Sequence, residues 1–142
     1  MADDKSTSAT STTQSIAVSA LRAQQARMRI IAENLANAGS TSKTPGGDPY
    51  RRQAPVFQAT TVAGGGTGVK MARAVPDKSA FNSAFEPSNP SADANGYVKT
   101  PNVDPLIEAM DMRDAQRAYE ANLNVIETAR SMDTRTLDIL KQ

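Results

Sequence analysis

The sequence predicts a mainly α-helical protein in which two long terminal helices pack as a coiled-coil-like layer, with a small β region inserted between them. Two amphipathic segments near opposite ends of the chain predict the helices, and all eight glycines and seven of the eight prolines fall between those segments. The 142 residues are enough for one domain. We expect a leader over residues 1–14, paired helices over 15–40 and 103–142, and an insert over 41–102.

The leader is rich in Ser and Thr and contains no large apolar side chain after Met1. Such a segment gains little burial with which to offset the entropy lost on ordering, so we expect it to be disordered. It also lacks the basic start and the apolar stretch of a secretory signal peptide.

The first helix is predicted to begin near Ser15 and to end at Ala38. Gly39 follows at the position where a residue with a left-handed backbone commonly ends a helix. An apolar stripe with one polar member runs along this segment at alternating spacings of four and three residues. Its members are Ala17, Leu21, Gln24, Met28, Ile31, Leu35 and Ala38.

The second helix is predicted to start at Asp104 and Pro105, which suit the cap and the first position of a helix. Glu108 and Asp111 complement the positive end of the helix dipole. No Pro or Gly occurs from Leu106 to Gln142, so one helix of about 36 residues is expected.

Two adjoining stripes run along the second helix. One stripe is enough for one partner helix, so two stripes predict neighbours on more than one side. The members of the first are Met112, Ala115, Tyr119, Asn122, Ile126 and Ala129, and those of the second are Ala118, Asn122, Val125, Ala129, Met132, Thr136 and Ile139. The two helical segments carry opposite charge: residues 16–38 sum to +2 and residues 105–142 sum to −2. This complementarity favours their pairing.

The insert contains the β-strand signals. Residues 51–62 and 68–75 carry strand-forming residues on either side of the Gly64–Gly66 turn, which predicts a hairpin. Residues 86–96 form a turn-rich loop, and short extended pieces flank it at 81–85 and 97–100. The Tyr50, Arg51 and Arg52 cluster is predicted to anchor the junction of helix and hairpin, with a phosphate contact as the alternative.

Alanine dominates the apolar residues, and this limits the core. Of 55 apolar residues, 23 are Ala, whereas Leu, Ile, Val and Phe together make up only about 16% of the chain. A protomer that completes its core against other copies explains this composition better than a small self-sufficient helical protein. An ordinary intramolecular helical hairpin remains compatible with the pattern.

The residue types exclude most catalytic chemistry. Without His or Cys the chain cannot build a Ser/His/Asp or Cys/His site, and it lacks the commonest metal ligands. Gly64–Gly68 lacks the Lys-Ser/Thr of a phosphate-binding loop. No apolar run is long enough for a membrane span, and a net charge of +1 gives no case for nucleic-acid binding. We expect no catalytic, cofactor or metal site.

Three sequence segments, in the order in which they occur along the chain, resemble one protein family. The first, at residues 20–41, is ALRAQQARMRIIAENLANAGST and resembles the N-terminal signature of flagellar rod and hook proteins. The second, at 50–57, is YRRQAPVF, and the third, at 96–140, is GYVKTPNVDPLIEAMDMRDAQRAYEANLNVIETARSMDTRTLDIL. Both are similar to the FlgC-type proximal rod family. The chain departs from that pattern in the longer leader, the glycine tract and Asn89-Pro90, where many relatives have His-Pro.

The resemblance implies a structural subunit of the bacterial flagellar basal body that polymerises helically into the drive shaft carrying motor torque to the hook and filament. It implies export through the flagellar type III apparatus without a cleaved signal, and assembly in the periplasm. The implied partners are other copies of the chain and the rod proteins FlgB, FlgF, FlgG and FliE. A free copy is expected to have disordered terminal helices that fold on assembly.

The expected assembly interface combines residues of both helices. Its members are Leu21, Gln24, Met28, Ile31, Asn34, Leu35, Asn37, Tyr119, Asn122, Leu123, Val125, Ile126, Ala129, Met132 and Leu137, with a junction at Tyr50, Arg51, Arg52, Asp104 and Pro105. The alternatives are a cytoplasmic coiled-coil adaptor or export-associated protein, another rod subunit such as FlgB, and a small hydrolase that uses carboxylates alone.

Overall fold

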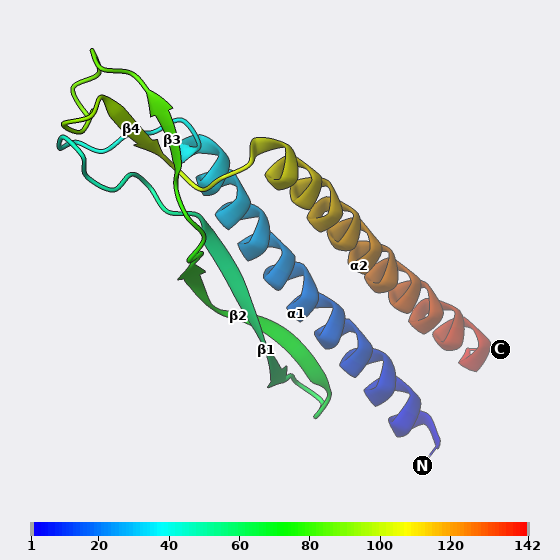
Figure 1. The fold of residues 1–142 in the computed structure, drawn as a ribbon. Coiled ribbons are helices and arrows are strands. Elements are labelled where there is room, and N and C mark those ends of the chain that lie inside the picture. Colours follow the sequence, from blue (N-terminus) through cyan, green and yellow to red (C-terminus); the bar gives the residue numbers. More distant parts are fainter. Residues whose placement is uncertain (1, 142) are drawn as a thin grey trace. The chain divides into compact units, whose positions relative to one another are not determined.

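Along the chain, one long helix precedes four strands and a second long helix follows them (Figure 1). The computed structural model describes residues 2–141, with side chains described from Ser8 onward. The elements are α1 (Ala2–Asn37), β1 (Gln53–Thr61), β2 (Thr67–Pro76), β3 (Asn82–Phe85), β4 (Tyr97–Thr100) and α2 (Pro105–Leu140). Strands β1 and β2 form one two-stranded sheet, and β3 and β4 form another. The predicted fold class is confirmed.

The first helix begins earlier than the sequence predicted. It starts at Ala2 instead of near Ser15, which corrects the expectation of a disordered leader for residues 2–14; residue 1 lies outside the described residues. The hydroxyls of Thr12, Thr13 and Ser15 each donate to the carbonyl four residues earlier, at 2.9–3.0 Å. A Ser or Thr hydroxyl that hydrogen-bonds to a carbonyl of its own helix can be accommodated in that helix. The Ser/Thr-rich segment is therefore helical.

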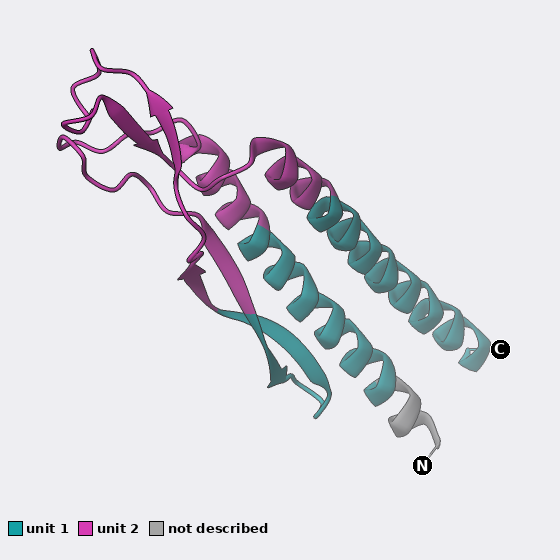
Figure 2. Cartoon of the chain, in the orientation of Figure 1, with its two compact units in different colours: residues 1–27, 57–72, 114–142 teal, residues 28–56, 73–113 magenta. Residues whose placement is uncertain are grey.

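The chain divides into two compact units, coloured separately in Figure 2. Unit 1 comprises residues 1–27, 57–72 and 114–142, and unit 2 comprises residues 28–56 and 73–113. Both helices and the first hairpin therefore contribute residues to each unit. This division differs from the one expected from sequence, in which the helices and the insert are separate parts.

Unit 1 is built on alanine. Its buried apolar side chains among the described residues are Ala17, Ala23, Ala115 and Ala129, each at most 5% exposed. The side-chain amide of Gln14 on α1 donates to Asp133 on α2 at 3.3 Å. Small side chains let two helices approach closely, but burying a methyl group contributes only about 0.8 kcal/mol. Unit 1 is therefore held by many weak contacts.

Glycines bring the hairpin of unit 1 against α1. A Cβ atom at Gly64 would lie 2.2 Å from the Thr12 hydroxyl, and one at Gly68 would lie 2.3 Å from the Ser19 hydroxyl. The Ser19 hydroxyl also accepts a hydrogen bond from the Val69 amide at 3.1 Å. The glycine tract thus forms the turn and also allows the hairpin to approach the helix closely.

We expect Gly68→Ala to destabilise the chain by about 1–3 kcal/mol, because the added methyl group overpacks the contact with Ser19. Thermal unfolding of the purified chain measures the effect. Gly39→Ala is the matched control, since nothing lies within 4 Å of a Cβ at Gly39. Equal melting temperatures for the two variants would show that the hairpin does not depend on this close approach.

Unit 2 contains the larger buried side chains. Ile30 and Ile31 of α1, Val98 of β4 and Val103 are each at most 5% exposed. Strands β3 and β4 run antiparallel with Asn82 opposite Thr100 and Phe85 opposite Tyr97. The start of α2 is capped as predicted, since the Asp104 carboxylate accepts the Leu106 amide at 2.9 Å and the Ile107 amide at 3.4 Å.

Candidate assembly surface and its supporting junction

Asn34 is at the centre of a buried polar network in unit 2. It is 1% exposed. Its side-chain amide donates to the Gln53 carbonyl at 2.8 Å and to the Glu108 carboxylate at 3.3 Å. Its carbonyl oxygen accepts from the Tyr50 hydroxyl at 2.8 Å and from the Gln53 amide at 2.9 Å. One side chain of α1 therefore fixes the start of β1 and the first turn of α2 within this unit.

Glu108 is fully buried and pairs with Arg52. The Arg52 guanidinium also reaches Asp77 at 3.4 Å and Asp111 at 3.7 Å. Burial lowers the pKa of Arg52, but the hydrogen bond and charge of Glu108, followed by Asp77, raise it by more, so its pKa stands above the ordinary value. A charge can be buried without a large loss of stability only if it is paired and hydrogen-bonded. The Glu108 carboxylate meets this requirement through the Arg52 guanidinium and the Asn34 amide.

The surrounding groups complete this junction. Hydrogen bonds from the backbone and hydroxyl of Ser79 lower the pKa of Asp77, and Arg52 lowers it further. Burial raises the pKa of Tyr50, and the charges of Glu33 and Glu108 raise it further, so its hydroxyl keeps the proton that it donates to Asn34.

Arg51 and Asn102 attach the segment after β2 to the same junction. Arg51 donates to the carbonyls of Asp77 at 2.8 Å and Ser79 at 2.9 Å, and its guanidinium lies 4.1 Å from the centroid of the Phe81 ring. Asn102 accepts the Arg52 amide at 2.8 Å and donates to the Ser79 hydroxyl at 2.8 Å.

Sequence reasoning placed Tyr50, Arg51 and Arg52 at a junction but missed the partners. From sequence alone Glu108 is expected only to complement the helix dipole. A signal was present, because Glu108 continues the first apolar stripe of α2 backward through Met112 at a spacing of four residues. A charged residue at an apolar position of a helix indicates a buried ion pair.

The residues predicted for the assembly interface fall into three groups by exposure. Ile31, Asn34 and Ala129 are buried within the single chain. The half-buried group consists of Leu21, Gln24, Met28, Leu35, Asn37, Tyr119, Asn122 and Ile126. Leu123, Val125, Met132 and Leu137 are exposed, by 37%, 43%, 61% and 54% respectively. The single chain thus already covers the first stripe of α2 in large part and leaves much of the second open.

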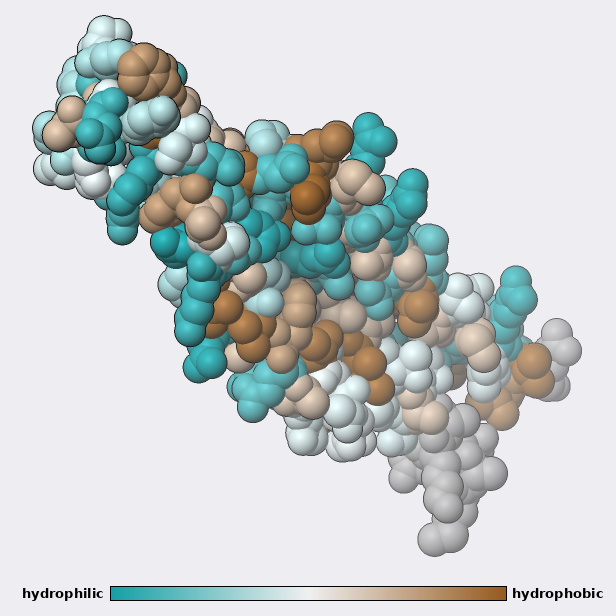
Figure 3. All heavy atoms as spheres, viewed as in Figure 1, coloured by the Kyte–Doolittle hydropathy of each residue, from teal (hydrophilic) through white to brown (hydrophobic). Residues whose placement is uncertain are grey.

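The exposed members of the second stripe, with Ala121 and Thr128 beside them, form an outer stripe on the unit 1 segment of α2. We define it as Ala121, Val125, Thr128, Met132, Thr136 and Ile139, all of which are exposed. Their spacings of three and four residues place them along one side of the helix. Figure 3 shows hydrophobic side chains reaching the surface along α2 between hydrophilic ones. Thr13 of α1 joins Val125, Thr128 and Met132 in lining a shallow groove of about 290 Å³.

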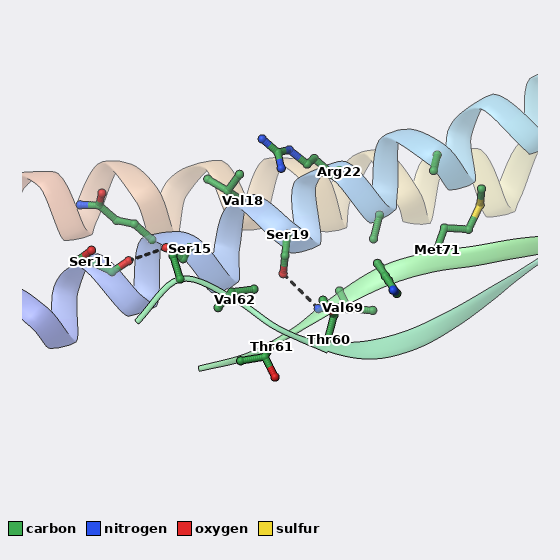
Figure 4. A pocket seen from close by; sticks show the side chains of 15 residues that line it. Ser11, Ser15, Val18, Ser19, Arg22, Thr60, Thr61, Val62, Val69 and Met71 are labelled. Atoms are coloured by element: carbon green, nitrogen blue, oxygen red, sulfur yellow. Dashed lines mark hydrogen bonds between the residues drawn. The ribbon is translucent and has the colours of Figure 1, made fainter. Parts of the chain in front are cut away.

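A second groove in unit 1 lies between α1 and the β1–β2 hairpin, and it has a volume of about 740 Å³. Figure 4 shows Ser19 of α1 pointing toward Val69 of β2, with the hydrogen bond between them. Hydroxyl, alanine and valine side chains line most of it. Among the described residues no group of three Asp or Glu is arranged to hold a metal ion. Nor does either described helix have an apolar run suited to crossing a membrane.

Two family models match the ends of the chain. The model "Flagella basal body rod protein" matches residues 15–42, and the model "Flagellar basal body rod FlgEFG protein C-terminal" matches residues 94–139. The first match contains Asn34, and the second contains Glu108 and the outer stripe.

Curated relatives match nearly the whole length. The flagellar basal-body rod protein FlgC of Agrobacterium fabrum is 47% identical over 127 residues, covering 89% of this chain and 91% of that protein. FlgC of Salmonella typhimurium is 46% identical, covering 87% and 92%. FlgC of Bacillus subtilis is 37% identical, covering 89% and 95%. The chain therefore belongs to the FlgC family of flagellar basal-body rod proteins, the structural subunits of that rod.

Proposed function

We propose that this chain is a proximal-rod protomer that joins its neighbours through the outer stripe of α2. The observation that carries the proposal is the exposure of Val125, Met132 and Ile139 at 43%, 61% and 74% along one side of α2, next to the side on which Ala115 and Ala129 are buried. Burying each such side chain fully contributes about 1.5–3 kcal/mol, so a neighbouring helix laid on this stripe is strongly favoured.

The mechanism is mechanical and not catalytic. A protomer that uses different surfaces toward its two neighbours makes heterologous contacts, and such contacts generate a helical assembly when they do not close into a ring. Torque passes through many contacts at once, so no single site has to be strong. The absence of His and Cys supports this role over an enzymatic one.

The buried network of unit 2 has a different role from the outer stripe. Because Asn34 and Glu108 are satisfied within the chain, they set the direction in which α1, β1 and α2 leave the junction. The interface predicted from sequence divides accordingly. Ile31, Asn34 and Ala129 support the protomer, while Leu123, Val125, Met132 and Leu137 remain available to neighbours.

The proposed neighbours are other copies of this chain and the rod proteins FlgB, FlgF, FlgG and FliE, with assembly in the periplasm. The flagellar type III apparatus is the proposed route of export. An alanine-based core supports this route, because unit 1 loses little burial energy when it unfolds for passage.

In free chains we expect backbone amides of unit 1 to exchange hydrogen faster than those of unit 2. Among the described residues unit 1 buries only alanines, whereas unit 2 buries Ile and Val side chains and Glu108, which pairs with half-buried Arg52. Hydrogen exchange read by mass spectrometry would compare residues 120–140 with residues 98–112. Equal, strong protection in both ranges would contradict the view that the terminal helices complete their packing on assembly.

A reconstruction of isolated basal bodies tests the function itself. The proposal requires density for this chain in the proximal rod, with α1 and α2 in the layer around the axial channel and the outer stripe against a neighbouring subunit. A chain absent from the rod would refute the function, and an outer stripe facing open solvent would refute the assigned surface.

A further inference from the structure

The groove between α1 and the hairpin has the chemistry of a docking site for an acidic helix. Its apolar wall includes Val18, Val62 and Val69, and Arg22 is also a lining residue (Figure 4). Lys70 is a second cation in the lining. None of the described residues that line the groove is Asp or Glu. The groove thus offers an apolar surface with two cations and no anion of its own.

The two cations are not matched within unit 1. Neither Arg22 nor Lys70 makes an ion pair with any residue that the structure describes. The segments that form the groove, residues 8–27 and 57–72, contain Arg22, Arg27 and Lys70 but no Asp or Glu. A partner that brings carboxylates is favoured electrostatically, and one that brings cations is repelled.

A complementary strip lies elsewhere on the same chain. We call Glu120, Leu123 and Glu127 the acidic edge of α2; all three are exposed. At 1.5 Å per residue the two glutamates stand about 10 Å apart along the helix, with the leucine between them. Glu127 and Arg130 have the spacing of a surface pair, yet no ion pair joins them in the described chain. The acidic edge and the outer stripe occupy different sides of α2, because helix positions repeat every 3.6 residues.

We propose that the acidic edge of one copy docks in the helix–hairpin groove of a second copy. Leu123 enters the apolar wall, and Glu120 and Glu127 approach Arg22 and Lys70. The inference rests on the proposed function. It adds to that function which two surfaces of neighbouring copies are in contact. Because groove and edge are different surfaces of one chain, the contact is heterologous and propagates from copy to copy. It leaves the outer stripe available for another neighbour.

Cross-linking in assembled basal bodies tests the contact directly. The chain has no cysteine, so introduced thiols are unambiguous. A tagged Leu123→Cys chain and a differently tagged Met71→Cys chain, whose new thiol lines the groove, are expressed together and treated with a short thiol cross-linker. The expected product is a dimer carrying both tags. Ile139→Cys on the outer stripe is the control and should link to Met71→Cys at least tenfold less.

Charge exchange provides the second arm. Arg22→Glu with Lys70→Glu should reduce incorporation into basal bodies at least tenfold, and adding Glu120→Lys with Glu127→Lys to the same chain should restore most of it. Failure of both the cross-link and the rescue, with native chain present in basal bodies, overturns this inference and leaves the proposed function standing. A cross-link only to a protein of another mass overturns the choice of a second copy. Native chain missing from basal bodies would refute the proposed function instead.

Discussion

Replacing Glu108 by Ala should lower the free energy of unfolding by about 3 kcal/mol, the largest stability effect that we expect from a single side chain here. Glu108 is fully buried and holds both Arg52 and Asn34. Its removal leaves a guanidinium and an amide without their partner in the interior of unit 2. Asp77 and Asp111 retain part of the Arg52 charge compensation, which places the loss at the lower end of the range for broken buried pairs.

Urea unfolding of the purified chain measures this loss. Glu127→Ala on the same helix removes an equally charged but exposed side chain and should change stability by no more than about 0.5 kcal/mol. If Glu108→Ala stays within that same margin, the buried pair does not hold the unit together.

The double variant Arg52→Met with Glu108→Met separates charge from packing. Two apolar side chains of similar length leave no uncompensated charge, so the double variant should be more stable than Glu108→Ala. A double-mutant cycle built from the two single Met variants gives the coupling energy between the positions. A coupling energy near zero would mean that Glu108 acts through packing alone.

The helices and the hairpin could be predicted because local chemistry determines them. Asp104 and Pro105 define the start of α2, and the Gly64–Gly66 turn separates β1 from β2. The start of α1 was placed too late, because composition alone does not reveal that hydroxyls such as those of Thr12 and Thr13 bond within the helix. Caps and turns can be recognised because they depend on residues close together in the sequence. A Ser/Thr-rich composition, by contrast, is compatible with either a helix or a disordered segment.

The polar junction could be predicted only in part. Its members Asn34, Arg52 and Glu108 are separated by 18 and 56 residues along the chain, and no periodicity connects them. The stripes on α2 were visible in the sequence, but the side that the chain would cover itself was not. Val125 and Ile126 are adjacent in sequence, yet Val125 is exposed and Ile126 is half-buried. That choice depends on where α1 lies within the unit, which is a tertiary property.

Met132→Asp should abolish swimming by preventing incorporation of the chain into the rod. Met132 is 61% exposed in the single chain, so the folded protomer tolerates a carboxylate there. Arg135 lies three residues further along the helix and offers that carboxylate a neighbour of opposite charge. In an assembled rod the same carboxylate would be buried against an apolar neighbour, at a cost of several kcal/mol. Such a cost lowers association by more than about 100-fold.

Swimming in soft agar and the recovery of chain in isolated basal bodies are the two measurements. Met132→Leu keeps the apolar side chain and should swim normally. Gln25→Asp introduces a carboxylate at an exposed position of α1 outside the outer stripe and both grooves, and it should also swim. Circular dichroism of the Met132→Asp chain should match that of the native chain, which separates an assembly defect from a folding defect. Normal motility of Met132→Asp would show that the outer stripe is not a contact surface in the rod, whatever the exposure of its side chains.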